Sequence, residues 1–225
     1  MGGMRLLLIR HGQTFSNIGH KLDTAAPGAE LSELGRRQAA AIPEALAGEQ
    51  IDAIYASNLV RAQETAAPLA DALGLQVRTR DGIREIAAGD LEMRSDEESI
   101  QQYVDVVFGW PADLESRVPG GESGVEVLAR FDEVVAEAAG SGVGTVAFVS
   151  HGAVIRVWVG VRSTNVDSAY TMEHWLMNTA MVAVEGSPQD GWTVVQWTEY
   201  PLGGPQLADP THTGPGGEPE QLHHA

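Results

Sequence analysis

Short apolar runs alternate with longer amphipathic stretches along this chain, and that alternation restricts the fold more than any other feature of the sequence. The run RLLLI at 5–9 precedes a stretch with helical spacing at 31–48, and the run IDAIYAS at 51–57 precedes another at 59–75. Short apolar runs of this kind are typical of buried strands. We therefore predict an α/β fold, a three-layer α/β/α sandwich with a largely parallel central sheet, because strands that alternate with helices favour this architecture.

The alternation continues through the rest of the chain, which closes with a predicted antiparallel pair of strands. The segment at 81–95 contains charges and glycine without a clear period, so we expect it to be irregular. The other predicted elements are a short strand at 76–80, helices at 95–108 and 123–139, a strand followed by a helix within 144–161, and a closing antiparallel pair at 180–186 and 192–197.

Length and composition favour one globular domain followed by a tail. With 225 residues, 43% of them hydrophobic and 20% charged, the chain has enough apolar material for a sizeable core. We expect a single domain over 1–202. Glycine and proline are frequent and large apolar residues are few from 203 to 225, which predicts a disordered tail.

The formal net charge of −17 restricts the partners that the chain can bind. Sequence-independent binding to nucleic acid needs many Lys and Arg residues, and anionic membrane surfaces attract the same residues, so we expect neither partner. The N-terminal apolar run is too short for a signal peptide and no apolar segment approaches the length of a membrane span, which predicts a cytoplasmic protein. The absence of cysteine excludes disulfides, thiolate nucleophiles and Cys-ligated zinc.

Three of the predicted strands end in polar side chains of reactive character. Arg10 and His11 follow the first strand, Ser57 and Arg61 follow the second, and His151 follows a later one. Ligands of open α/β sheets bind beyond the carboxyl ends of the strands. We therefore expect these side chains to share one pocket.

Side chains of these types are suited to phosphoryl transfer. The planar guanidinium group meets phosphate oxygens bidentately, so Arg10 and Arg61 indicate an anionic ligand. A histidine with an ordinary pKa near ~6.5 is largely neutral at pH 7 and can attack through a ring nitrogen. Positioning and electrostatic stabilisation dominate catalysis of phosphoryl transfer, and the two arginines with His151 can provide both around His11.

The departing oxygen of such a reaction needs an acid within hydrogen-bond reach. The irregular segment DGIREIAAGDLEM offers three carboxylates, Glu85, Asp90 and Glu92. The local sequence by itself does not choose among them.

A family resemblance is carried by six segments that follow one another between residue 4 and about residue 156. They read IRHGQTFSN, LSELGRRQA, YASNLVRAQETA, IREIAAGDLE, GGES and FVSHGAVIR. In this order they make the chain resemble the histidine phosphatase superfamily, which includes phosphatases and phosphoglycerate mutases. The resemblance implies the phosphoglycerate mutase-like form of the sandwich and the phosphatase-type branch of the family.

The resemblance also implies roles for residues that match the family's motifs. His11 stands where the family carries the nucleophile that becomes phosphohistidine. Arg10, Arg61 and Asn17 match positions that bind the phosphate. His151 matches the family's second histidine, which is both catalytic and in contact with the phosphate.

The acid is also selected by the resemblance. Glu85, directly after Arg84, matches the residue that protonates the leaving oxygen in phosphatase-type members, which favours it over the other two carboxylates. Gly12 is expected to allow a close backbone turn at the pocket. Thr14 is either a hydroxyl donor in the pocket or an ordinary helix cap.

Departures from the family pattern bear on the reaction. In the segment GDLEMR, Leu91 and Met93 stand where relatives often carry an aromatic residue and a glycine after the acid. This difference affects the substrate side of the pocket. Phosphoglycerate mutases carry an extended motif at this place that begins Glu-Arg-His-Tyr-Gly, and a later basic, proline-rich insertion. Both are absent from this sequence, which favours hydrolysis. We expect a metal-independent phosphomonoesterase that acts on a small phosphorylated metabolite. The alternatives are a phosphoglycerate mutase-like phosphotransferase and a non-catalytic phospholigand-binding protein.

No cofactor is expected for this reaction. A metal site built from His11, His151 and Glu85 lacks a familiar ligand spacing, and the flanking arginines would repel a cation, so we predict no metal. A homodimer is the default expectation for the assembly.

Overall fold

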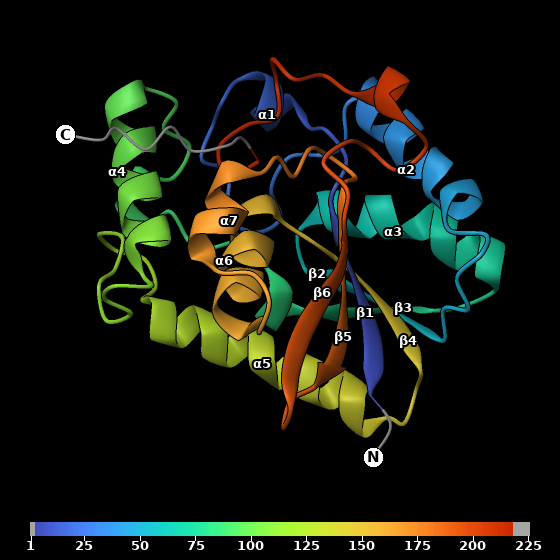
Figure 1. Cartoon of the computed structure of the whole chain (residues 1–225). Helices are drawn as coiled ribbons and strands as arrows, with labels where there is room; N and C mark the ends of the chain where they lie inside the picture. Colours follow the sequence, from blue (N-terminus) through green and yellow to red (C-terminus); the bar gives the residue numbers. More distant parts are fainter. Residues whose placement is uncertain (1–2, 218–225) are drawn as a thin grey trace.

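The computed structural model describes residues 3–217, and within them one mixed sheet of six strands forms the centre of the molecule (Figure 1). The strands are β1 (Met4–Arg10), β2 (Ala53–Ser57), β3 (Val77–Arg80), β4 (Thr145–Ser150), β5 (Met181–Ser187) and β6 (Gly191–Trp197). They lie in the order β3-β2-β4-β1-β5-β6, and the first four of these are parallel. β5 is antiparallel to β1, and β6 is antiparallel to β5.

Helices cover both faces of the sheet, which confirms the predicted three-layer α/β/α sandwich. One face packs against α2 (Glu33–Ala45) and α3 (Val60–Leu73), and the other against α5 (Gly124–Gly140) and α6 (Gly152–Arg162). Shorter or more peripheral helices complete the described chain: α1 (Phe15–Ile18), α4 (Glu97–Gly109), α7 (Ser168–Glu173), and the 3-10 turns η1 (Asp81–Ile83), η2 (Gly89–Leu91) and η3 (Pro205–Leu207). No helix in residues 3–217 has the length and apolar character needed to cross a membrane.

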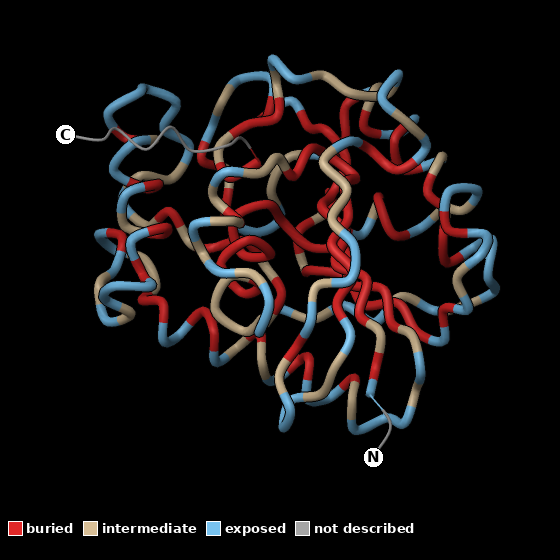
Figure 2. Tube along the Cα trace, in the orientation of Figure 1, coloured by how far each residue is buried: buried red, intermediate tan, exposed pale blue. Residues whose placement is uncertain are grey.

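The first strand shows why its sequence is apolar without interruption. Leu6 and Leu8 belong to the core on the α5–α6 side, whereas Leu7 and Ile9 belong to the core on the α2–α3 side. Each of the four is fully buried, and Figure 2 shows the centre of the sheet as mostly buried. A strand with both faces covered needs an apolar residue at every position.

The helix ends follow the local signals in the sequence. Ser32 caps α2, because its hydroxyl accepts a hydrogen bond from Gly35 N at 3.1 Å. Gly74 ends α3 with a φ of 65°, a left-handed conformation that favours glycine. The short helices α1 and α7 were not predicted, since segments of four and six residues are too short to show a helical period.

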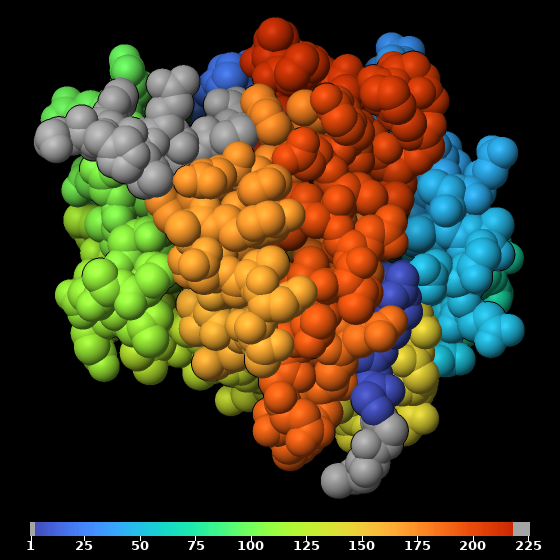
Figure 3. Space-filling view, in the orientation of Figure 1, coloured from blue at the N-terminus to red at the C-terminus, as the bar shows by residue number. Residues whose placement is uncertain are grey.

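The segment after residue 202 differs from the expected disordered tail over 203–217. Figure 3 shows this segment, in red, along the upper edge of the molecule. Gln38 Nε2 donates to Leu207 O at 2.8 Å, Arg156 Nη1 donates to Gly216 O at 3.1 Å, and Leu176 N donates to Gly217 O at 3.0 Å. Two buried side chains and one backbone amide of the domain thus donate hydrogen bonds to backbone carbonyls of a segment poor in large apolar residues. The remainder of the expected tail, 218–225, lies outside the described residues.

Candidate active site

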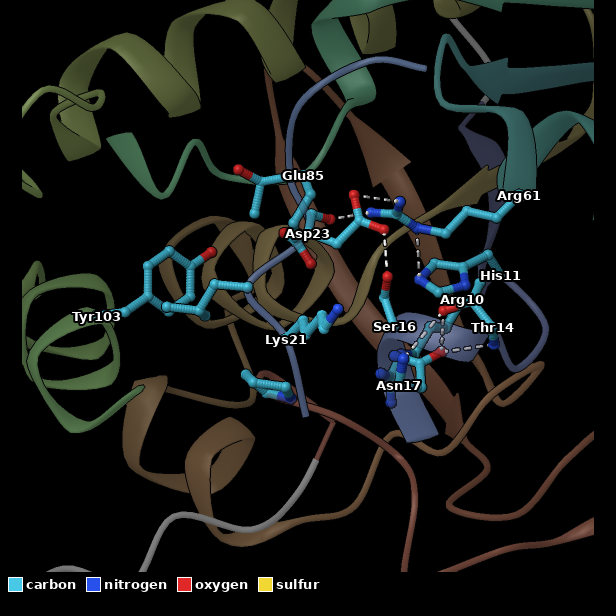
Figure 4. Close-up of a pocket in the computed structure, with 13 residues that line it drawn as sticks. Arg10, His11, Thr14, Ser16, Asn17, Lys21, Asp23, Arg61, Glu85 and Tyr103 are labelled. Atoms are coloured by element: carbon cyan, nitrogen blue, oxygen red, sulfur yellow. Dashed lines mark hydrogen bonds and ion pairs between the residues drawn. The ribbon is translucent and has the colours of Figure 1, made fainter. Parts of the chain in front are cut away.

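A pocket opens beyond the carboxyl ends of β1 and β2, where the strand ends were expected to meet (Figure 4). Residues from seven separate parts of the chain form its wall: Arg10 and His11; Thr14, Ser16 and Asn17; Lys21 to Thr24; Arg61; Glu85; Tyr103; and Pro215. Five of the six predicted site residues are in this wall. The sixth, His151, is fully buried behind it, and the centroid of its ring lies 5.1 Å from that of His11.

The two ring nitrogens of His11 have different partners, which define its tautomer. Nδ1 lies 2.7 Å from Gly12 O, so it carries the hydrogen. Nε2 accepts a hydrogen bond from Arg61 Nε at 3.1 Å, so it carries the lone pair. The lone pair is therefore on the nitrogen that faces the guanidinium group.

The surroundings of His11 keep its ring neutral. Burial lowers its pKa well below the usual 6.5, and the positive charges of Arg61 and then Arg10 lower it further. A neutral ring retains its Nε2 lone pair at pH 7. His11 can thus act as a nucleophile without a separate base.

The turn that carries His11 is held by close contact with two helices. Gly12 N donates to Thr65 Oγ1 of α3 at 2.9 Å. A Cβ on Gly12 would lie only 2.8 Å from Gly35 O in α2, so a side chain there would push this helix away. This close approach is the physical reason for the glycine in Arg-His-Gly.

Arg61 is held at the start of α3 by one neighbouring loop residue. Its Nη2 donates to Asp23 O at 2.8 Å, and its Nη1 lies 3.8 Å from Asp23 Oδ1. Asp23 is itself fixed, because its Oδ2 accepts hydrogen bonds from Ser16 Oγ at 2.6 Å and Ala29 N at 2.9 Å. Within residues 3–217, Nη1 of this buried guanidinium has no hydrogen-bond partner. An anion in the pocket would provide one.

Arg10 is held by two segments that come much later in the chain. Its Nη1 donates to Leu176 O at 2.8 Å, and its Nη2 donates to Thr213 O. The side chain is 1% exposed, which means that its orientation is set by packing and these carbonyls together. The segment expected to be a disordered tail therefore helps to position a predicted phosphate-binding residue.

His151 lies at the N-terminal end of α6 and contacts Ser57. Its Nε2 is 2.8 Å from Ser57 Oγ, and that hydroxyl also accepts a hydrogen bond from Leu59 N at 3.2 Å. His151 Nδ1 is buried and has no hydrogen-bond partner in the described part of the chain. Burial first, and then the nearby Arg61, lower the pKa of His151 well below 6.5. When the hydroxyl donates to Nε2, the neutral ring presents Nδ1–H as a donor.

Ser57 does not line the pocket, but its contact with His151 gives it a testable role. Ser57→Ala is expected to lower kcat/KM for an aryl phosphate about tenfold, because one hydrogen bond that selects the Nδ1–H tautomer is lost. Ser57→Thr keeps the hydroxyl and should recover most of this activity. Steady-state kinetics together with the dissociation constant of vanadate would test this. A lower melting temperature with unchanged kcat/KM would contradict the positioning role.

Asn17 enters the pocket from α1, where it forms a reciprocal cap with Thr14. Asn17 Oδ1 accepts hydrogen bonds from Thr14 N at 3.0 Å, from Thr14 Oγ1 at 3.1 Å and from Asn178 Nδ2 at 3.2 Å. Thr14 Oγ1 in turn accepts from Asn17 N. Three donors thus occupy the amide oxygen of Asn17, which leaves its Nδ2 as the group to offer to a phosphate. Thr14 is a helix cap that also lines the pocket.

Glu85 contacts the first turn of α6, at the positive N-terminal end of that helix. Its Oε1 accepts hydrogen bonds from Ile86 N at 2.9 Å and Val154 N at 3.0 Å, and its Oε2 accepts from Ala153 N at 3.3 Å. These bonds aim the carboxyl group, which is 8% exposed, at the pocket. A carboxylate is favoured at the N-terminus of a helix.

The other two carboxylates of the irregular segment differ in position from Glu85. Glu92 accepts hydrogen bonds from Thr24 N at 2.9 Å, from Ala25 N at 3.0 Å and from the Thr24 hydroxyl at 2.5 Å, so it anchors the loop beside the pocket. Asp90 is exposed, and neither residue lines the pocket. Geometry therefore favours Glu85, in agreement with the resemblance.

Sequence reasoning missed several residues that shape the pocket. Tyr103 is buried, donates to Ile86 O at 3.0 Å and has a pKa raised well above 10 by burial, so it stays neutral. Asn178 does not line the pocket, but its Nδ2 donates to His11 O at 3.1 Å and to Asn17 Oδ1 at 3.2 Å, and so links the backbone of His11 to Asn17. Lys21 and Asp23 lie four and six residues after the end of the first motif, and this proximity is the one sequence signal that could have identified them.

The charges in the pocket favour an anion. Two buried guanidinium groups lie beside two neutral imidazoles, and donors converge on the side where His11 Nε2 is located. In residues 3–217 there is no group of three or more His, Asp or Glu side chains arranged to hold a metal ion. The arrangement can hold a phosphoryl group and attack it.

Comparisons with known proteins agree with this geometry. A family model described as the histidine phosphatase superfamily (branch 1) matches residues 6–200. A glucosyl-3-phosphoglycerate phosphatase of Mycobacterium tuberculosis is 39% identical over 141 residues, 61% of this chain and 61% of that protein. A PE-PGRS family protein of the same organism is 32% identical over 213 residues, 87% of this chain and 36% of that protein. The chain thus spans less than two thirds of either curated relative.

The similarity of this chain to known proteins includes the fold, as the superposition on a solved structure shows. It is a mycobacterial glucosyl-3-phosphoglycerate phosphatase in complex with inorganic phosphate, and it superposes with a TM-score of 0.73 at 29% identity. The match covers 89% of this chain and 99% of that chain.

Proposed function

The chain belongs to branch 1 of the histidine phosphatase superfamily, and from this we propose that it is a metal-independent phosphatase that hydrolyses a phosphomonoester through phosphohistidine. The strongest support is the state of His11, a buried neutral imidazole whose Nε2 lone pair lies beside the guanidinium group of Arg61. Such a ring needs no deprotonation before it attacks phosphorus.

In the first step His11 Nε2 attacks phosphorus in line with the departing oxygen. The N–P bond forms as the P–O bond breaks, and Glu85 gives a proton to the departing alcohol. Arg61 Nε exchanges its bond with Nε2 for one with a phosphoryl oxygen. The positive charge that develops on the ring is stabilised by the Nδ1–H bond to Gly12 O, 2.7 Å long in the free enzyme.

In the second step water hydrolyses the phosphohistidine. The Glu85 carboxylate takes a proton from this water, whose oxygen attacks phosphorus while the P–N bond breaks. The electron pair of that bond returns to Nε2, so the ring is neutral again. Phosphate leaves and the enzyme is ready for another turnover.

The equatorial oxygens are held by donors that are already oriented. Arg10, Arg61, the Nδ1–H of His151 and the Nδ2 of Asn17 supply them. The buried Arg61 Nη1 and His151 Nδ1 lack hydrogen-bond partners among residues 3–217, so phosphate binding would satisfy both. Oriented donors at the position of developing charge make up the largest contribution in reactions of this type.

The relatives support the phosphatase class and a small phosphorylated metabolite as substrate. One is named for a phosphorylated sugar acid, and a neighbouring structure contains inorganic phosphate. We propose the same class of substrate for this chain.

A rapid-quench experiment tests the proposed function. The purified protein is mixed with 32P-labelled phenyl phosphate in EDTA, and we expect acid-labile, base-stable label on His11 together with sustained phosphate release. Activity that requires a bisphosphorylated primer would instead indicate a phosphotransferase. A folded protein that binds phosphate but shows neither label nor release would indicate a binding protein.

A further inference from the structure

Arg130 of α5 donates three hydrogen bonds to the backbone of the segment that carries Glu85. Its Nη1 donates to Gly82 O at 2.7 Å and to Arg84 O at 2.9 Å, and its Nη2 donates to Glu85 O at 3.2 Å. The Arg130 side chain is only 11% exposed, so these bonds lie in a contact from which water is largely excluded. One side chain thus holds the main chain up to and including Glu85.

Glu122, in the loop before α5, binds both Arg130 and the same segment. Its Oε1 accepts hydrogen bonds from Arg130 Nε at 2.8 Å and from Arg84 Nη2 at 2.6 Å. Its Oε2 accepts from Arg130 Nη2 at 3.1 Å and from Ala87 N at 3.3 Å. A bidentate pair of this kind gives the guanidinium group one orientation. The bond to Ala87 N also extends the contact to the residue two positions after Glu85.

The segment itself has no regular structure that could hold it. Residues 84–88 lie between η1 and η2 and belong to no helix or strand. Buried backbone groups outside helices and sheets need other hydrogen-bond partners. A Cβ on Gly82 would lie 2.4 Å from Arg130 O, so the start of the segment lies directly against α5. Arg130 and Glu122 provide partners that a neighbouring strand would otherwise supply.

The carboxyl group of Glu85 depends on the position of this backbone. Glu85 accepts hydrogen bonds from Val154 N at 3.0 Å and from Ala153 N at 3.3 Å, in the first turn of α6. Amides of a first helical turn have no partner within their own helix, so the carboxylate satisfies them. These bonds require the main chain of Glu85 to stay beside α6. A general acid must also remain within hydrogen-bond reach of the departing oxygen, where a displacement of about 1 Å can cost up to roughly 100-fold in rate.

We propose that the Arg130–Glu122 ion pair positions the general acid, with Arg130 as the principal positioning residue. This inference rests on the proposed function, in which Glu85 protonates the departing alcohol. Neither Arg130 nor Glu122 lines the pocket, so both act through Glu85 and not on the substrate. Their removal should therefore affect leaving groups that need a proton and spare those that do not.

Two esters with different leaving groups test the inference. We expect Arg130→Met to lower kcat/KM for glycerol 3-phosphate about tenfold and that for p-nitrophenyl phosphate less than about threefold, because nitrophenolate departs without a proton. Arg130→Lys keeps the positive charge but loses the planar fork, so it should lower the same alkyl-to-aryl ratio. Steady-state kinetics measures the ratio, and circular dichroism establishes that each variant is folded.

A double-mutant cycle tests whether Arg130 acts through Glu85. Arg130→Met added to Glu85→Gln should leave the alkyl-to-aryl ratio of kcat/KM at the value that Glu85→Gln alone produces. The matched control is Arg162→Met, which removes a guanidinium group paired with another carboxylate of α5. Arg162 donates to Asp132 Oδ2 from Nε at 3.1 Å and from Nη2 at 2.6 Å. This control should leave the ratio unchanged.

Hydrogen exchange provides a measurement that does not depend on turnover. The amides of Ala153 and Val154 donate to Glu85, so Arg130→Met should speed their exchange about tenfold, and Arg162→Met should not.

The outcomes separate this inference from the proposed function. An unchanged ratio in Arg130→Met, or an equal loss on both esters, would overturn the positioning role. An unchanged ratio in Glu85→Gln would instead contradict the acid assigned in the proposed function. Wild-type protein that hydrolyses neither ester would contradict the proposed function as a whole, whereas hydrogen exchange would still decide whether Arg130 holds Glu85 beside α6.

Discussion

His11→Ala is expected to lower kcat by roughly 10⁴-fold or more, because no other group in the pocket can form the covalent intermediate. Phosphate should still bind, since Arg10, Arg61 and His151 are retained. The measurements are stopped-flow turnover of p-nitrophenyl phosphate, quench labelling, and the dissociation constant of phosphate. The variant should also show no acid-labile label.

A second histidine variant separates this loss from general damage. His174→Ala removes a ring that stacks on Tyr170 and does not line the pocket, so it should turn over normally. Circular dichroism would establish that both variants are folded. Turnover by His11→Ala within about tenfold of wild type would contradict the proposed mechanism.

Glu85→Gln should have the second largest effect, with kcat/KM for an alkyl phosphate lowered about 10²- to 10³-fold. The loss of kcat/KM should be much smaller for p-nitrophenyl phosphate, because nitrophenolate departs without needing a proton. Because kcat/KM reports the steps up to release of the alcohol, comparing the two substrates isolates protonation of the leaving group from the later hydrolysis of phosphohistidine. The measurement is the ratio of kcat/KM values for the alkyl and aryl esters in wild type and variant.

The chain provides two matched controls for this experiment. Asp90→Asn and Glu92→Gln remove one carboxylate each from the same irregular segment, and neither residue lines the pocket. Neither should change the ratio of alkyl to aryl kcat/KM. An equal loss of kcat/KM on both substrates in Glu85→Gln would indicate that Glu85 supports the structure at the start of α6, where it accepts hydrogen bonds from Ala153 and Val154.

The order of the main elements could be predicted from the sequence. Strands with both faces buried need continuous apolar runs, and this is why β1, β2 and β4 were recognisable. The strand-end motifs then located Arg10, His11 and Arg61 in one pocket, because parallel strands end at the same edge of the sheet. Each of these inferences depends on residues that are close in the sequence or on a general property of the fold.

The chemistry of each group was decided by contacts between distant segments. The tautomer of His11 depends on Arg61, which lies 50 residues away, and His151 depends on Ser57, which lies 94 residues away. Arg10 is held by Thr213, in a segment whose composition predicted disorder. The composition of that segment does not reveal that its backbone carbonyls accept hydrogen bonds from a buried guanidinium group.

The sequence by itself determined the α/β architecture and the residue types brought to the carboxyl edge of the sheet. Only the tertiary structure decided which His11 nitrogen carries the lone pair, which of the three carboxylates lines the pocket, and that Lys21 lines it too. The physical reason is that hydrophobic periodicity is a local property, visible over a few residues. Hydrogen bonds, burial and the pKa shifts that follow from them arise only when segments far apart in the chain are packed together.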